Sequence, residues 1–232
     1  MRAILLIGTN FVRGQWMTVL VMTIYLAGIA GVFAHNPERQ ESRFFLEMHA
    51  FYILFLSVVI AVPALQMERR SRRIVAVLSK GIHRWQYLGG ILCGCCMIAG
   101  IFCLLVGGIA WMLCRVGGYP TEGLGGMVVA LLACCLLATS AGLFYSTFLH
   151  PFLATGAASA TLVLPMITQT AGWHLRKELF PVAWLAESLA RFRFGSPVET
   201  AALCASAAVL AMLFWFGGAA VFARRDVTIS PE

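Results

Sequence analysis

The residues of this chain best suited to chemistry are its eight cysteines and five histidines, because thiolates and imidazoles act as nucleophiles and metal ligands. The densest group is Cys93, Cys95 and Cys96, and thiolates favour soft metal ions. No histidine or carboxylate lies close to them in sequence, and Cys93 and Cys95 point to different faces of a helix. Most of the cysteines fall within apolar runs, where a free thiol behaves as a small hydrophobe, so helix packing is the favoured interpretation.

The motifs of P-loop ATPases and of zinc metalloproteases do not occur in the sequence. There is no G-x-x-x-x-G-K-[ST], so the chain does not bind ATP through a P-loop, and there is no H-E-x-x-H. Glu68 directly precedes a run of arginines and is interpreted as an ion-pair partner rather than a catalyst. The histidines are scattered near predicted loops, at His35, His49, His83, His150 and His174. We therefore predict no catalytic residue, and no metal or cofactor bound by this chain.

The elements that must position these residues are membrane-spanning helices. A soluble domain carries about 25% charged residues, whereas this chain has 12% charged and 60% hydrophobic residues. A span needs about 20 mainly apolar residues, so the whole chain, 1–232, is predicted to form one all-α membrane domain with six transmembrane helices. The first is interpreted as a retained span rather than a secretion signal, because its apolar run is long. The predicted spans are 17–34, 48–66, 87–114, 124–148, 152–172 and a last one from Ser196 to about Ala223.

The most charged stretch of the chain, residues 67–86, lies between the second and third predicted spans. Short loops rich in arginine and lysine stay in the cytoplasm. Four apolar residues recur there at spacings of three and four, as on one face of a short helix: Val75, Leu78, Ile82 and Trp85. We interpret the stretch as a cytoplasmic helix that contacts another protein; a solvated basic loop that only fixes the topology is the alternative. The residues expected to make the contact are Glu68, Arg69, Arg70, Arg72, Arg73, Leu78, Lys80, Ile82, His83, Arg84 and Trp85.

The distribution of charge is consistent with both termini in the cytoplasm. The segments predicted to be cytoplasmic carry ten positive and three negative residues, and those predicted to be outside carry seven of each. The whole net charge of +7 therefore belongs to the cytoplasmic side. Because the positive-inside bias explains this excess, no nucleic-acid partner is predicted.

Three further segments are predicted to lie beside the spans. Residues 1–16 alternate apolar and polar side chains and suit a helix along the inner membrane surface. Residues 35–47 are polar and are expected to form an outer loop, and Pro63 is expected to bend or unwind the inner end of the second span. Residues 173–200 are rich in aromatics and arginines, which is typical of the membrane–water interface. Four apolar residues of this segment share one face and predict a short outer helix that dips into the membrane. They are Val182, Leu185, Leu189 and Phe192.

Two patterns within the spans indicate helix packing or a pathway. Gly90 and Gly94 form a G-x-x-x-G pair, which permits the close approach of another helix. The fifth span carries a more polar stripe, and polar side chains in a span turn toward protein or a water-filled cavity. This stripe either holds helices together or lines a route for substrate. Its members, at spacings of four and three, are Thr155, Ser159, Leu162, Met166 and Gln169.

In this order along the chain, several stretches resemble the ABC-2 type permeases, the membrane subunits of ATP-binding cassette transporters. Met67-Glu68-Arg69 and the stretch from Leu78 to Tyr87 (LSKGIHRWQY) are similar to the segment between the second and third spans of that family, with Gly81 where many members have proline. The hairpin 142–164 resembles the junction of the fourth and fifth spans, and residues 221–227 (VFARRDV) resemble the final exit.

The resemblance implies a function and a set of partners. A separate ATPase subunit, holding ATP and Mg²⁺, would dock on the coupling segment 67–86, and a second permease copy or a related permease would complete the pathway in a bacterial inner membrane. Residues 1–16 would be the interfacial helix, and 173–200 the re-entrant outer helices. The chain itself would then be a lipid-embedded exporter subunit and not an enzyme. The alternatives are a secondary transporter and a membrane-embedded redox or metal-handling protein.

Overall fold

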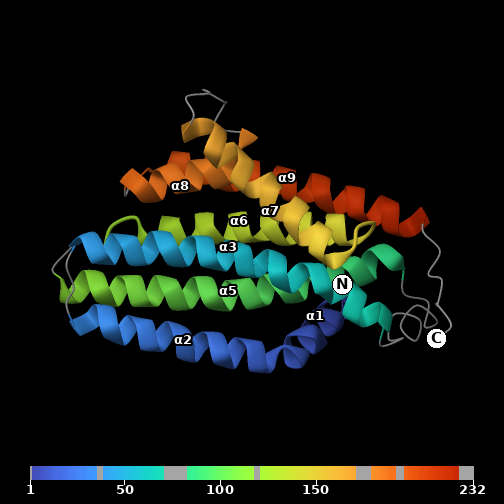
Figure 1. Ribbon diagram of the computed structural model, residues 1–232, viewed down its shortest axis with the longest axis horizontal. Helices are drawn as coiled ribbons and strands as arrows, with labels where there is room; N and C mark the ends of the chain where they lie inside the picture. The colour runs from blue at the N-terminus through green and yellow to red at the C-terminus, as the bar shows by residue number, and fades with distance from the viewer. Residues whose placement is uncertain are drawn as a thin grey trace.

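The computed structural model describes residues 2–35, 39–70, 83–117, 121–170, 179–191 and 196–224. Every regular element in these residues is a helix, which confirms the all-α class. Long helices lie side by side in a bundle, and α7 and α8 lie across one side of it (Figure 1). The helices are α1 (Arg2–Gly14), α2 (Trp16–His35), α3 (Arg39–Arg70), α5 (Arg84–Val116), α6 (Leu124–Ser146), α7 (Pro151–Thr170), α8 (Pro181–Arg191) and α9 (Pro197–Arg224).

Four of the described helices, α3, α5, α6 and α9, are long and apolar enough to cross a membrane. A fifth span is formed if α1 and α2, which meet at an angle of 61°, are counted as one broken crossing. The apolar part of α7, Pro151–Pro165, is shorter than a full span. The chain is therefore a multi-pass membrane protein by the length and composition of its helices, with four to five candidate spans among the described residues, and the number six stays a prediction.

Helices α3, α5 and α6 form the centre of the bundle (Figure 1). Helix α2 lies along α5, whereas α7 and α9 both pack on α6. The sequences of the three central helices are apolar all round, as expected of helices buried by protein on one side and lipid on the other. Small residues let the backbones approach, as where a Cβ on Gly142 would lie 3.2 Å from the Cβ of Ala61. The largest fully buried side chains of these three helices are Tyr87, Phe45 and Phe102.

Helix α3 differs from the sequence prediction at both ends. Residues 39–47, expected in an outer loop, already belong to the helix. No glycine or proline interrupts residues 39–62, so the helix extends beyond the apolar run, and polarity alone gave the wrong boundary. At the other end, the helix continues through Pro63 to Arg70 without unwinding.

Residues 179–191 and the start of α9 confirm two predictions made from spacing. Val182, Leu185 and Leu189 of α8 are all buried, whereas Phe192 lies outside the described residues. The hydroxyl of Ser196 accepts a hydrogen bond of 3.4 Å from the backbone N–H of Glu199, and α9 begins with Pro197 between them. This is a standard helix start, in which a serine caps the first turn and proline occupies its first position.

Candidate functional site at the basic end of the bundle

The predicted coupling segment 67–86 is continuous with the two central helices. Glu68, Arg69 and Arg70 belong to the end of α3, and Arg84 and Trp85 begin α5. Both ends of the predicted segment therefore belong to the long helices, because α3 continues into it from one side and α5 from the other. Its middle lies outside the described residues, and with it Arg72, Arg73, Leu78, Lys80 and Ile82.

Helix α5 begins at a well-defined cap. The backbone of His83 is extended, and its N–H donates to Oε1 of Gln86 at 3.3 Å. The carbonyl of His83 accepts from the backbone N–H groups of Gln86 and Tyr87 at 3.0 and 3.1 Å. Tyr87 is 1% exposed, so the first turn is also held by packing. The start of α5, where the predicted coupling segment enters the helix, is thus fixed by hydrogen bonds and by burial.

Arg84 binds the end of another helix. Its Nη1 donates to the carbonyl oxygens of Phe222 and Ala223, at 3.3 and 3.1 Å, in the last turn of α9. The last four carbonyls of a helix lack partners within the helix and carry partial negative charge, so a guanidinium there is favourable. The sequence assigned Arg84 to an external contact, whereas the structure uses its side chain inside the chain. Trp85, the next residue, is 48% exposed and remains open to a partner.

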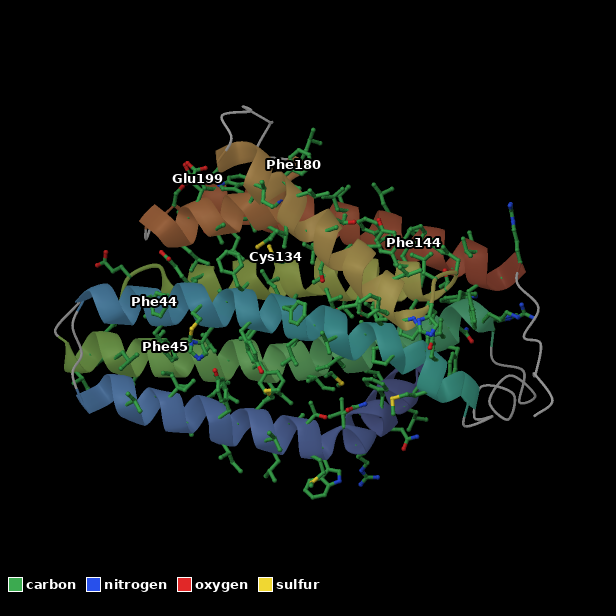
Figure 2. The ribbon with its side chains drawn as sticks, viewed as in Figure 1. Phe44, Phe45, Cys134, Phe144, Phe180 and Glu199 are labelled. Carbon is green, nitrogen blue, oxygen red and sulfur yellow. The ribbon has the colours of Figure 1, made fainter. Side chains whose placement is uncertain are left out.

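The ends of α3 and α9, the start of α5 and the N-terminal helix α1 all lie toward the same end of the bundle (Figure 1). We call it the basic end, because its described helices carry Arg13, Arg69, Arg84 and Arg224 there. The opposite end contains charges of both signs, among them Glu199 at the start of α9 (Figure 2) and Arg115 in the last turn of α5. The charge asymmetry of the sequence therefore corresponds to an asymmetry between the two ends of the described fold.

Helix α1 is locked to this end through glycines. A Cβ on Gly90 would lie 2.7 Å from the side chain of Ile7, and one on Gly94 would lie 2.9 Å from the backbone oxygen of Gly8. A Cβ on Gly8 would in turn lie 3.2 Å from the backbone of both α5 glycines. The predicted G-x-x-x-G pair is therefore a close-packing site, and α1 is the helix that occupies it.

The predicted polar stripe of α7 is divided between the helix itself and the protein interior. Thr155 donates to the carbonyl of Pro151 at 2.9 Å, within its own helix, and the buried Oγ of Ser159 has no partner. Ala154, Ala158 and Leu162 form the buried face of the helix. The side chains of Met166 and Gln169 lie outside the described residues. The described half of the stripe thus fits helix packing, and its role in a pathway stays a prediction.

His49 is a buried polar residue that sequence reasoning missed. It was expected near a surface loop, but it is 0% exposed, stacked on Phe45 at 4.1 Å between ring centroids. Its Nδ1 donates to the carbonyl of Phe45 at 2.8 Å, and its Nε2 is buried without a partner. The missed signal is periodicity, because His49 follows Phe45 and precedes Ile53 by one helical turn each, on the buried face.

The cysteines of the described helices form no metal centre. Sγ atoms of Cys103 on α5 and Cys135 on α6 lie 3.9 Å apart, which is a contact between two helices. Sγ of Cys134 approaches the carbonyl of Pro181, at the start of α8, at 3.8 Å. No group of three or more potential metal ligands converges among the described side chains.

In comparisons with known proteins, no family model and no curated protein matches this chain.

Proposed function

We propose that this chain is the membrane-spanning permease subunit of an ATP-binding cassette transporter, an exporter driven by a separate ATPase subunit. The observation that carries the proposal is that α3 and α5 lead directly into the basic connector, the residues between the end of α3 at Arg70 and the start of α5 at Arg84. Both helices run unbroken from the buried core to the connector, and Arg84 joins the end of α9 to the same point. A partner that displaces the connector would therefore move three packed helices together.

The charge asymmetry supports a cytoplasmic position for this end. Short segments rich in arginine stay in the cytoplasm, where an ATPase would dock. In the proposed topology α2 and α7 complete six spans, both termini are cytoplasmic, α1 is interfacial and α8 is a re-entrant outer helix. The pathway would form between two permease copies in a bacterial inner membrane, with ATP and Mg²⁺ held by the partner.

The alternatives have less support from the described residues. A proton-driven carrier usually needs a buried carboxylate within a span; Glu47, in the candidate span of α3, is only half-buried, and no aspartate or glutamate is fully buried among the described side chains. A metal-handling protein would need converging ligands, which the described cysteines and histidines do not supply. These observations favour an energy source outside the chain.

Two tryptophans of α5 allow a matched test. Trp85 is 48% exposed at the basic end and Trp111 is 51% exposed at the other end of the same helix. Exposed tryptophans at interfaces are frequent hot spots, so Trp85→Ala should lower recovery of the ATPase about tenfold or more. The measurement is quantitative mass spectrometry of P-loop ATPases that co-purify with the tagged chain from its native membranes.

Trp111→Ala is the control and should retain wild-type recovery, because Trp111 lies at the opposite end of α5, where Arg115 forms a cation–π interaction with its ring at 5.2 Å. Recovery of no P-loop ATPase with the wild-type chain would contradict the proposal. An equal loss in both variants would show that the effect comes from α5 as a whole rather than from the basic end.

A further inference from the structure

A lateral groove lies between α7 and α9. Both helices pack on α6, with little direct contact between the two, and α8 packs against both. The groove contains a cavity of about 140 Å³. Its floor is formed by buried side chains of α6, α7 and α8, namely Leu137, Leu162, Val182 and Ala183. Its mouth is formed by half-buried side chains, namely Thr161, Pro165, Phe180, Leu210 and Phe214.

The two ends of the groove are closed by protein. The start of α8 closes one end, where the carbonyl of Pro181 reaches Sγ of Cys134 on α6. At the other end the ring of Phe214 lies 5.6 Å from Phe144 and 6.2 Å from Tyr145. Figure 2 shows Phe180 and Cys134 at a similar level along the bundle, with Phe144 farther toward the basic end. The start of α8 and the aromatic contacts of Phe214 therefore border the groove at two sides.

The groove offers no free hydrogen-bond donor from its lining side chains. Thr161 supplies the sole hydroxyl of the lining, and its proton is donated to the carbonyl of Ala157 at 2.8 Å. The hydroxyl of Tyr145 lies 3.0 Å from the Thr161 oxygen and must then be the donor to it. Water needs two to four polar partners to occupy a cavity, so this one is unsuited to water. Its size is close to the roughly 150 Å³ of an apolar cavity that binds benzene.

The rims of the groove identify the occupant, because they are part of the membrane-facing surface. Leu164 on α7 is 56% exposed, and Val209 and Leu213 on α9 are 57% and 63% exposed. These side chains are apolar and belong to helices of a multi-pass membrane protein, so lipid tails surround the mouth. An empty space of this size forfeits dispersion contacts on all its walls, and an adjacent lipid chain can restore them.

We propose that the groove between α7 and α9 binds one acyl chain of a bilayer phospholipid. The chain enters sideways between Leu164 and Leu213 and fills the space above Leu137. A headgroup is not expected to enter, because the lining side chains offer it no charge and no free hydrogen-bond donor. This site needs no ATPase and is independent of the transport function proposed above.

The test uses the full chain in vesicles of phosphatidylcholine that contain a fraction of phosphatidylcholine with a diazirine midway along one acyl chain. After illumination, mass spectrometry should find adducts concentrated at residues 161–165 and 210–214. They should exceed those at a freely exposed side chain such as Ile24 by about threefold or more, because a packed chain stays longer than a mobile one.

Two tryptophan variants on one helix sharpen the test. Leu210→Trp fills the mouth and should lower the groove adducts about threefold or more, whereas Met212→Trp, at a position that is 59% exposed on the same helix and is not part of the lining, should leave them unchanged. Adducts spread evenly over the exposed faces of α2, α7 and α9 would overturn the proposal, as would groove labelling that persists in Leu210→Trp. Loss of the groove adducts on dimerisation would show that a second copy of the chain covers the groove, and this result would also overturn the proposal. If Leu210→Trp does not fold, the adduct map of the wild-type chain decides.

Discussion

Replacement of Gly94 by leucine is expected to detach α1 from α5. A side chain at this position begins with a Cβ 2.9 Å from the backbone oxygen of Gly8 and 2.9 Å from Cδ1 of Phe11. Neither contact can be relieved by rotating a flexible side-chain end, because one is backbone and the other is an aromatic ring. Overpacking of this kind costs about 1–3 kcal/mol, which α1 can avoid by leaving its groove.

Hydrogen–deuterium exchange measures this outcome directly. Peptides from 4–14 should exchange faster in Gly94→Leu, while those of α6 keep their wild-type protection. Gly8→Leu should give the same result from the other side of the contact, since its Cβ would lie 3.2 Å from α5 backbone atoms. Gly108→Leu is the control, because nothing lies within 4 Å of a Cβ at that position of α5. Unchanged protection of α1 in Gly94→Leu would contradict the observed packing.

Replacement of Arg84 by alanine is expected to loosen the end of α9. The change removes two charge-assisted hydrogen bonds, to the carbonyls of Phe222 and Ala223. Hydrogen bonds to charged groups contribute about 1.5–3 kcal/mol each where they are buried, and the partial exposure of Arg84 places the combined loss nearer to about 2 kcal/mol. Exchange of residues 217–224 should increase, and the unfolding temperature of the purified chain should fall.

Two variants separate the contact from the charge. Arg84→Lys keeps a cation that can reach helix carbonyls and should restore part of the protection. Arg13→Ala removes a positive charge from an exposed position at the same end of the bundle and should leave α9 unaffected. Equal loosening of α9 by Arg13→Ala would mean that net charge, and not the Arg84 hydrogen bonds, holds the helix end.

The parts of the fold that the sequence predicted correctly are governed by short-range periodicity. Apolar runs of sufficient length located α5, α6 and α9 within a few residues, and the spacing of Val182, Leu185 and Leu189 predicted the buried face of α8. Ser196 and Glu199 predicted the start of α9 through capping. Each of these signals lies within a few residues of the feature it determines.

The parts that were missed depend on contacts between distant residues. Arg84 and Phe222 are 138 positions apart in the chain, and no local pattern connects them. Gly90 and Gly94 indicated a close-packing surface but not that α1 would occupy it. Polarity placed residues 39–47 in a loop, although a helix without a breaking residue can extend past its apolar part. The pathway residues could not be tested as a set, because Met166 and Gln169 are not among the described side chains.

The central claim, a cytoplasmic connector engaged by an ATPase, can be tested on the two lysines of the chain. Lys80 lies in the connector and Lys177 in the segment 173–200, which is predicted to be outside. The decisive measurement is modification of each lysine by a membrane-impermeant amine reagent, in intact cells and in inverted membrane vesicles. The account predicts that Lys177 reacts only in cells, and that Lys80 reacts only in inverted vesicles and is protected when the ATPase is bound. Modification of Lys80 in intact cells would contradict it, and so would full reactivity of Lys80 in the presence of the bound ATPase.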